Sequence, residues 1–143
     1  MAYEVYAQGQ GHLAQVYFQA VAFTGPFYVG LGTGGIPTGR TKTLADVTEV
    51  TGLGYSRKSI TREVGGTGWT LVDNMVSSPV LTFTSTNPDP NAEWDPVEYA
   101  FLTLSPSGVS SPNVLISCAE VPETWALGGG DSESIVFKFS LTD

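Results

Sequence analysis

The chain has 143 residues, a length typical of one domain and sufficient for a hydrophobic core without disulfides or metals. Apolar residues make up 41% of the chain and charged residues only 14%, against about 25% in an average soluble domain. The net charge of −8 argues against nucleic-acid binding, which needs a basic surface, and no apolar run approaches the roughly 18–20 residues that span a membrane. The first ten residues contain Glu4 and no Lys or Arg, so we expect no export signal and no membrane anchor.

The predicted elements are one helix followed by strands. Apolar residues recur at helical spacing between Gly11 and Ala22, and Gly25-Pro26 ends that pattern. Period-two alternation and turn residues then predict strands at Phe27–Leu31, Tyr55–Glu63, Trp69–Val72, Val80–Ser85, Val97–Leu104, Asn113–Val121 and Ile135–Leu141. The sequence therefore predicts an all-β fold: a single antiparallel β-sandwich or jelly-roll-like domain over residues 1–143, with one short N-terminal helix.

Residues 30–45 are rich in glycine and threonine and have no clear pattern. We expect either a mobile loop or an extended arm that becomes ordered against a partner. Two phosphate-binding patterns occur there by chance: Gly30 to Gly35 fits G-x-G-x-x-G, and Gly34 to Thr41 resembles a P-loop with Arg40 in place of lysine. The first pattern is not followed by the helix whose free N–H groups would hold a phosphate. The second lacks the P-loop lysine, for which arginine is no equivalent, and the parallel α/β context. We therefore predict no nucleotide site and no cofactor.

The chain has one histidine and one cysteine, and neither has the neighbours in sequence that a catalytic or metal site would need. His12 is the only histidine, and no cysteine or acid lies three or four residues away, as a helical metal site would need. Cys118 is the only cysteine and lies in an apolar run, where a buried and unreactive thiol is expected. We therefore predict no catalytic residue and no metal site.

Tryptophans near acids leave a binding role open. Trp94 lies among Asp89, Glu93, Asp95 and Glu98, a combination that can bind a sugar or a Ca²⁺ ion but that also occurs in solvated turns. The spacing of the acids does not match the D-x-D-x-D-G calcium loop. Exposed faces of Trp69, Trp94 and Trp125 would favour a carbohydrate-binding module, and three buried tryptophans would exclude it. Five of the six cations lie between Arg40 and Arg62, which favours either oppositely charged faces or one solvated basic strand.

The segment Thr48-Glu-Val-Thr-Gly-Leu-Gly-Tyr55-Ser-Arg57-Lys-Ser-Ile60 resembles a signature of small virion proteins of tailed bacteriophages, which carry a run of the form TEVSGGGYARQAV. The order of features from about His12 to Asp143 is similar as well: a helix, then the glycine–tyrosine–arginine strand, a tryptophan before a strand, and Gly130-Asp131 before the last strand. Three features differ from the family. Gly52-Leu53-Gly54 stands where members often have three glycines, Ser105–Pro112 stands where they tend to have a TGG turn, and the arm from Gly30 to Thr43 is longer and richer in glycine.

The resemblance implies a non-enzymatic virion component assembled in the bacterial cytoplasm, either a capsid decoration (cement) protein or a tail or tail-fibre component. The first implies two partners: the shell of the major capsid protein and further copies of this chain, expected as a homotrimer. Tyrosine and arginine are common at the energetic centre of interfaces. We therefore predict partner contacts at Tyr55 and Arg57, or at Arg40 and Lys42, while core packing remains the alternative for Tyr55.

Overall fold

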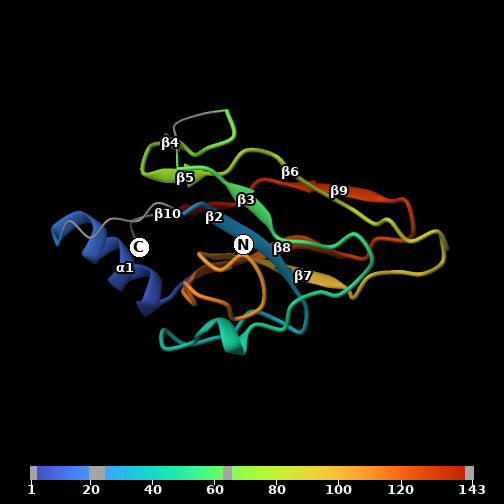
Figure 1. Ribbon diagram of the computed structural model, residues 1–143, viewed down its shortest axis with the longest axis horizontal. Coiled ribbons are helices and arrows are strands. Elements are labelled where there is room, and N and C mark those ends of the chain that lie inside the picture. The colour runs from blue at the N-terminus through green and yellow to red at the C-terminus, as the bar shows by residue number, and fades with distance from the viewer. Residues whose placement is uncertain (1–2, 20–24, 63–65, 141–143) are drawn as a thin grey trace.

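The computed structural model describes residues 3–19, 25–62 and 66–140 (Figure 1). Its elements in chain order are β1 (Tyr3–Val5), α1 (Ala7–Phe18), β2 (Phe27–Gly32), the 3₁₀ turn η1 (Leu44–Asp46), β3 (Lys58–Ile60), β4 (Thr70–Val72), β5 (Met75–Ser77), β6 (Leu81–Thr84), β7 (Val97–Thr103), β8 (Leu115–Trp125), β9 (Ser132–Ile135) and β10 (Lys138–Ser140). The expected all-β fold with one short N-terminal α-helix is confirmed. Within the described residues, no helix has the length and apolar character that a membrane span requires.

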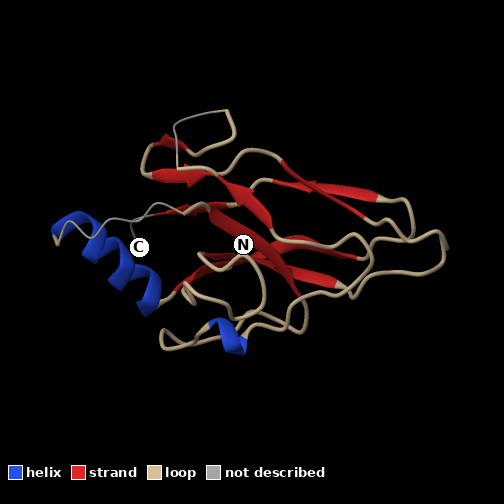
Figure 2. Cartoon of the chain, viewed as in Figure 1, coloured by secondary structure: helices blue, strands red, loops and turns tan. Residues whose placement is uncertain are grey.

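The strands form one large and two small antiparallel sheets. The large sheet has the order β1-β8-β7-β2-β3, and the small ones have the orders β10-β5-β4 and β6-β9. The small sheets together face the large one (Figure 2). Buried apolar side chains from both sides fill the space between them, for example Val29 and Leu102 from the large sheet with Phe83 and Phe137 opposite. This arrangement is a two-layer sandwich, whose core excludes water from both inner faces.

The outer face of the large sheet is buried too, which makes β7 apolar on both sides. A second cluster contains Tyr6, Leu44, Tyr99, Phe101, Leu115 and Cys118. It lies beneath the start of α1 and the segment that contains η1, so Cys118 is buried, as expected. Because both faces of β7 are covered, its sequence VEYAFLT has buried residues in succession rather than in alternation.

The glycine-rich segment lies against the body of the domain. Gly30–Gly32 continue β2, so the extended segment begins only after them. Added Cβ atoms on Gly30 and Gly32 would lie 2.3 Å and 2.1 Å from the rings of Phe101 and Tyr99, their partners on β7. The first two glycines of the G-x-G-x-x-G pattern therefore make room for aromatic rings on the neighbouring strand, which is a structural reason for their presence. After them, the Tyr6 hydroxyl donates to the Pro37 carbonyl at 2.8 Å.

The helix begins earlier than its apolar pattern predicts. It starts at Ala7 rather than Gly11 and ends at Phe18, and residues 20–22 of the prediction lie outside the described residues. An added Cβ on Gly9 would lie 2.7 Å from the Cα of Ile116, so the helix packs too closely against β8 for a side chain at this position. Glycine weakens a helix intrinsically, but here the tight packing against β8 outweighs its low propensity.

Several strand predictions need correction. The strand expected over Tyr55–Glu63 is limited to Lys58–Ile60, because Tyr55 and Arg57 make side-chain contacts rather than ladder pairs; residue 63 lies outside the described residues. The strand expected over Ile135–Leu141 is divided, since β9 pairs with β6 and β10 pairs with β5, and Leu141 is not described. The alternation in Val80–Ser85 is confirmed, with Leu81 and Phe83 buried. No pattern in the sequence predicted β1 or β5.

Candidate functional site

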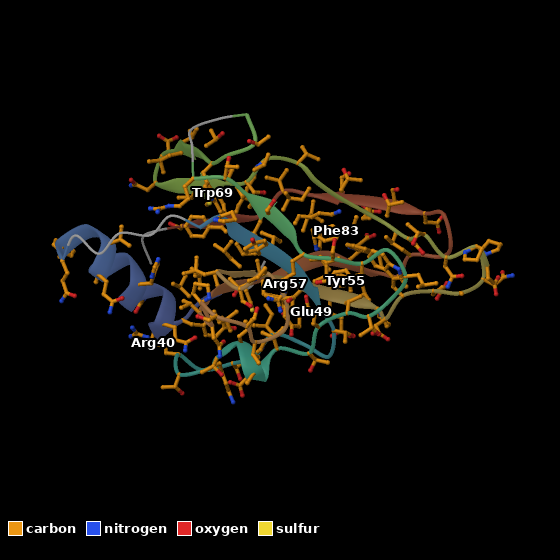
Figure 3. All side chains as sticks on the ribbon, in the orientation of Figure 1. Arg40, Glu49, Tyr55, Arg57, Trp69 and Phe83 are labelled. Atoms are coloured by element: carbon orange, nitrogen blue, oxygen red, sulfur yellow. The ribbon has the colours of Figure 1, made fainter. Side chains whose placement is uncertain are left out.

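The signature segment forms one polar network inside the domain, built by Glu49, Tyr55 and Arg57 (Figure 3). The Arg57 guanidinium donates from Nε to Glu49 Oε1 and from Nη2 to Glu49 Oε2, both at 2.8 Å. This is the bidentate fork that gives arginine–carboxylate pairs their geometric specificity. The Arg57 side chain is only 3% exposed and that of Glu49 is 24% exposed, so the pair is largely shielded from water.

Arg57 also holds the loop that follows β7. Its Nη1 donates to the Ser105 carbonyl and its Nη2 to the Gly108 carbonyl, both at 2.8 Å. The guanidinium lies over the Phe101 ring, 5.1 Å from its centroid, where a cation–π contact adds to the attachment. One side chain thus joins the segment before β3 to a loop 48 residues away.

Tyr55 completes the network. Its hydroxyl donates to Glu49 Oε1 at 2.7 Å and accepts the Leu31 N–H at 2.9 Å. Its ring packs against Phe83 and Trp94 in the core. Burial, and next the negative charge of Glu49, raise the pKa of Tyr55 well above its usual range, so the hydroxyl stays protonated as a donor.

The four predicted interface residues occupy two separate places. Tyr55 and Arg57 both contact residues of the same chain. The Tyr55 ring packs against the core, as the core-packing alternative predicted, and Arg57 is paired with Glu49. Arg40 and Lys42 lie on the surface. Arg40 donates to Gln10 on α1 (Figure 3), and Lys42 Nζ is 3.7 Å from an Asp46 carboxylate oxygen. A direct partner contact at any of the four stays a prediction, and exposure favours Arg40 and Lys42.

A groove of about 540 Å³ opens where β8 faces β9 and β10. Ala100 and Ala119 are among its lining residues, and their small side chains leave the space. The segments 120–125 and 133–138 supply the rest of the lining, which contains Trp125 together with the acids Glu120, Glu123 and Glu133. No sequence pattern predicted this groove, because its position depends on where the small sheets pack against β8.

The tryptophans differ in their surroundings. Trp94 is 3% exposed, and its Nε1–H donates to the Leu53 carbonyl at 3.0 Å. Trp69 is half-buried, with its ring edge-on to Phe27 at 5.5 Å between centroids. Trp125 is half-buried and lines the groove. Burial therefore excludes Trp94 from stacking on a sugar, and Trp125 is the tryptophan that lines the groove.

The remaining polar candidates lie in structural roles. The Asp95 carboxylate accepts from the N–H and the hydroxyl of Thr51 at 2.8 and 2.7 Å, and these bonds lower its pKa. Partial burial, and next the positive charge of Arg62, lower the pKa of His12 on α1. Within the described residues, no group of three or more His, Cys, Asp or Glu side chains is placed to hold a metal ion.

Comparison with known proteins finds no family model that matches the chain and no matching curated protein.

Proposed function

We propose that this chain is a structural component of a tailed-bacteriophage virion, most specifically a capsid decoration protein that binds the assembled shell through non-covalent contacts. The observation that carries the proposal is the role of the signature segment Thr48–Ile60. Three of its side chains, Glu49, Tyr55 and Arg57, form the network described above. The residues that make the chain resemble virion proteins are thus the residues that fix its shape.

Rigidity supports such a role physically. A protein that binds a preformed lattice loses less conformational entropy when its contact surface is ordered beforehand. Arg57 fixes the loop around Ser105 and Gly108, and Tyr6 and Ala7 hold the glycine-rich segment through Pro37 and Arg40. Both segments lie on the surface as defined shapes, and repetition over a shell would convert weak individual contacts into firm retention.

The test is to mix the purified chain with undecorated capsids of the phage that encodes it. Co-sedimentation at a fixed ratio to the major capsid protein is expected. Arg40→Glu should weaken it, while Lys138→Glu, an equal charge change on β10, should not. Binding only to tails or host cells, or no binding to any particle, would overturn the capsid assignment.

The second candidate is a tail or host-surface module that binds carbohydrate, and the groove favours it. An aromatic ring beside carboxylates suits a sugar, because the ring contacts the apolar face and the carboxylates accept hydroxyl hydrogens. Trp125 with Glu120, Glu123 and Glu133 provides these groups. Host saccharides should change the tryptophan fluorescence of the chain, and Trp125→Phe should remove that response. No response from the unchanged chain would contradict this candidate.

A further inference from the structure

The groove beside β8 is bordered on one side by an irregular stretch of that strand. Tyr99 on β7 pairs with Glu120 and Val97 pairs with Trp125, so β8 advances five positions where β7 advances two. Such a bulge redirects side chains and often occurs beside binding sites. All six residues from Glu120 to Trp125 line the groove, whereas every second residue of a regular strand would point away from it.

The opposite wall of the groove is the segment from Glu133 to Lys138, which contains the bend between β9 and β10. Phe137 in this bend is buried. Its N–H donates to the Ser78 hydroxyl and its carbonyl accepts the Ser78 N–H, both at 2.9 Å. The wall is therefore held by the domain itself, and a site formed in advance lowers the entropic cost of binding.

The lining of the groove combines apolar and acidic side chains. Val121 and Ile135 contribute half-buried apolar surface from the two walls. Glu120, Glu123 and Glu133 line the same groove and are exposed. Neither of the ion pairs found within the described residues involves any of these three carboxylates. A ligand in the groove therefore meets apolar surface next to carboxylates that no cation of the described chain neutralises.

The charges around the groove identify a cation as its complement. Lys138 is the one cation in the lining, because the other five lysines and arginines of the chain lie between Arg40 and Arg62 and none of them lines the groove. The lining thus carries three negative charges and one positive charge, in a chain of net charge −8. Both the local and the overall charge attract a cationic ligand and repel an anionic one, including a second copy of this chain.

The length of the groove favours an extended chain over a single sugar ring. Each wall has six residues, which span up to about 20 Å at the usual rise per strand residue. An extended segment of about six residues has this length. A neutral sugar can stack on Trp125, but it leaves the charges of the three carboxylates uncompensated.

We propose that the groove binds an extended cationic segment of a partner protein, in which lysines or arginines alternate with apolar residues. The apolar side chains contact the apolar part of the lining, and the cations pair with the three glutamates. A cation beside the half-buried Trp125 ring gains a cation–π contact as well. The inference rests on the proposed function, which makes the capsid shell the partner, and it names the chemistry of the shell segment.

The test is a titration of the chain with a blocked hexapeptide of alternating leucine and lysine, followed by calorimetry and by amide chemical shifts. Binding should shift amides of residues 120–125 and 133–138, and it should weaken as salt rises from about 0.02 M to about 0.5 M, because salt screens exposed charges. Glu133→Gln should weaken binding about twofold to fivefold, the range for one exposed ion pair, and Lys138→Gln should tighten it by a similar factor. Glu93→Gln removes an exposed charge outside the groove and should bind the peptide as the wild type does.

A peptide with glutamate in place of lysine is the control ligand and should not bind. The proposal is wrong if the lysine peptide does not bind at low salt, if Glu133→Gln binds it as the wild type does, or if the shifted amides lie outside the two walls. Shifts of the wall amides by neutral saccharides but not by the peptide would overturn it in favour of the carbohydrate candidate. The titration contains no capsids, so its failure is distinguishable from a failure of co-sedimentation, and peptide binding without co-sedimentation would remove only the capsid assignment.

Discussion

Removal of the Arg57 guanidinium should destabilise the fold far more than removal of an exposed cation. Arg57→Ala deletes four hydrogen bonds: two to the Glu49 carboxylate and two to the carbonyls of Ser105 and Gly108. Deleting one partner of a buried ion pair costs about 3–5 kcal/mol, because the other partner keeps its desolvation cost. Glu49 is partly exposed and regains some water, so we expect a loss of about 3 kcal/mol, at the low end of this range.

The measurement is the free energy of unfolding from urea titration by linear extrapolation. Lys42→Ala is the matched control, since it also removes one cation from an ion pair, here the exposed pair with Asp46. Exposed pairs gain little because water and salt screen them, so the control should leave stability almost unchanged. Arg57→Lys keeps the charge but not the fork, and it should fall between the two.

A second readout shows where the loss arises. Amides of residues 106–110 should exchange faster in Arg57→Ala, because the Ser105 and Gly108 carbonyls lose their donor. If Arg57→Ala costs less than about 1 kcal/mol, or no more than Lys42→Ala, the network does not stabilise the domain and the reasoning is refuted.

Three further predictions test the packing and the titrating groups. Gly32→Ala should lower the melting temperature because its Cβ would meet the Tyr99 ring at 2.1 Å, whereas Gly11→Ala, a helical position with open space, should raise stability by up to about 1 kcal/mol. Burial raises the pKa of Tyr99 to about 12, so the folded state keeps the phenol proton to a higher pH than the unfolded state. The free energy of unfolding should therefore fall as pH rises from about 10 to 12. Tyrosinate absorbance should appear together with unfolding rather than before it. The hydrogen bonds from Thr51 lower the pKa of Asp95, so the unfolded state binds the proton first as pH falls, and the free energy of unfolding should drop below about pH 4. In urea titrations, Asp95→Asn should make the free energy of unfolding depend less on pH in this acid range. An unchanged pH dependence in the variant would contradict the assignment.

The sequence predicted the class of fold because that information is local. Alternating residues such as Leu81 and Phe83 in β6, and breakers such as Gly25-Pro26, determine whether a short segment forms a strand and where it ends. Local patterns failed where packing opposes them. Gly9 weakens a helix in isolation, and only its contact with Ile116 on β8 explains why α1 includes it.

The contacts of the candidate site residues depended on tertiary structure more than the class of fold did. The sequence singled out Tyr55 and Arg57 by residue type and resemblance, but it did not reveal that Arg57 bonds the Ser105 carbonyl, 48 positions along the chain. It also did not distinguish buried Trp94 from groove-lining Trp125. Side-chain burial and partner choice depend on which distant strands pack together, and alternation specifies that a face is buried without specifying what buries it.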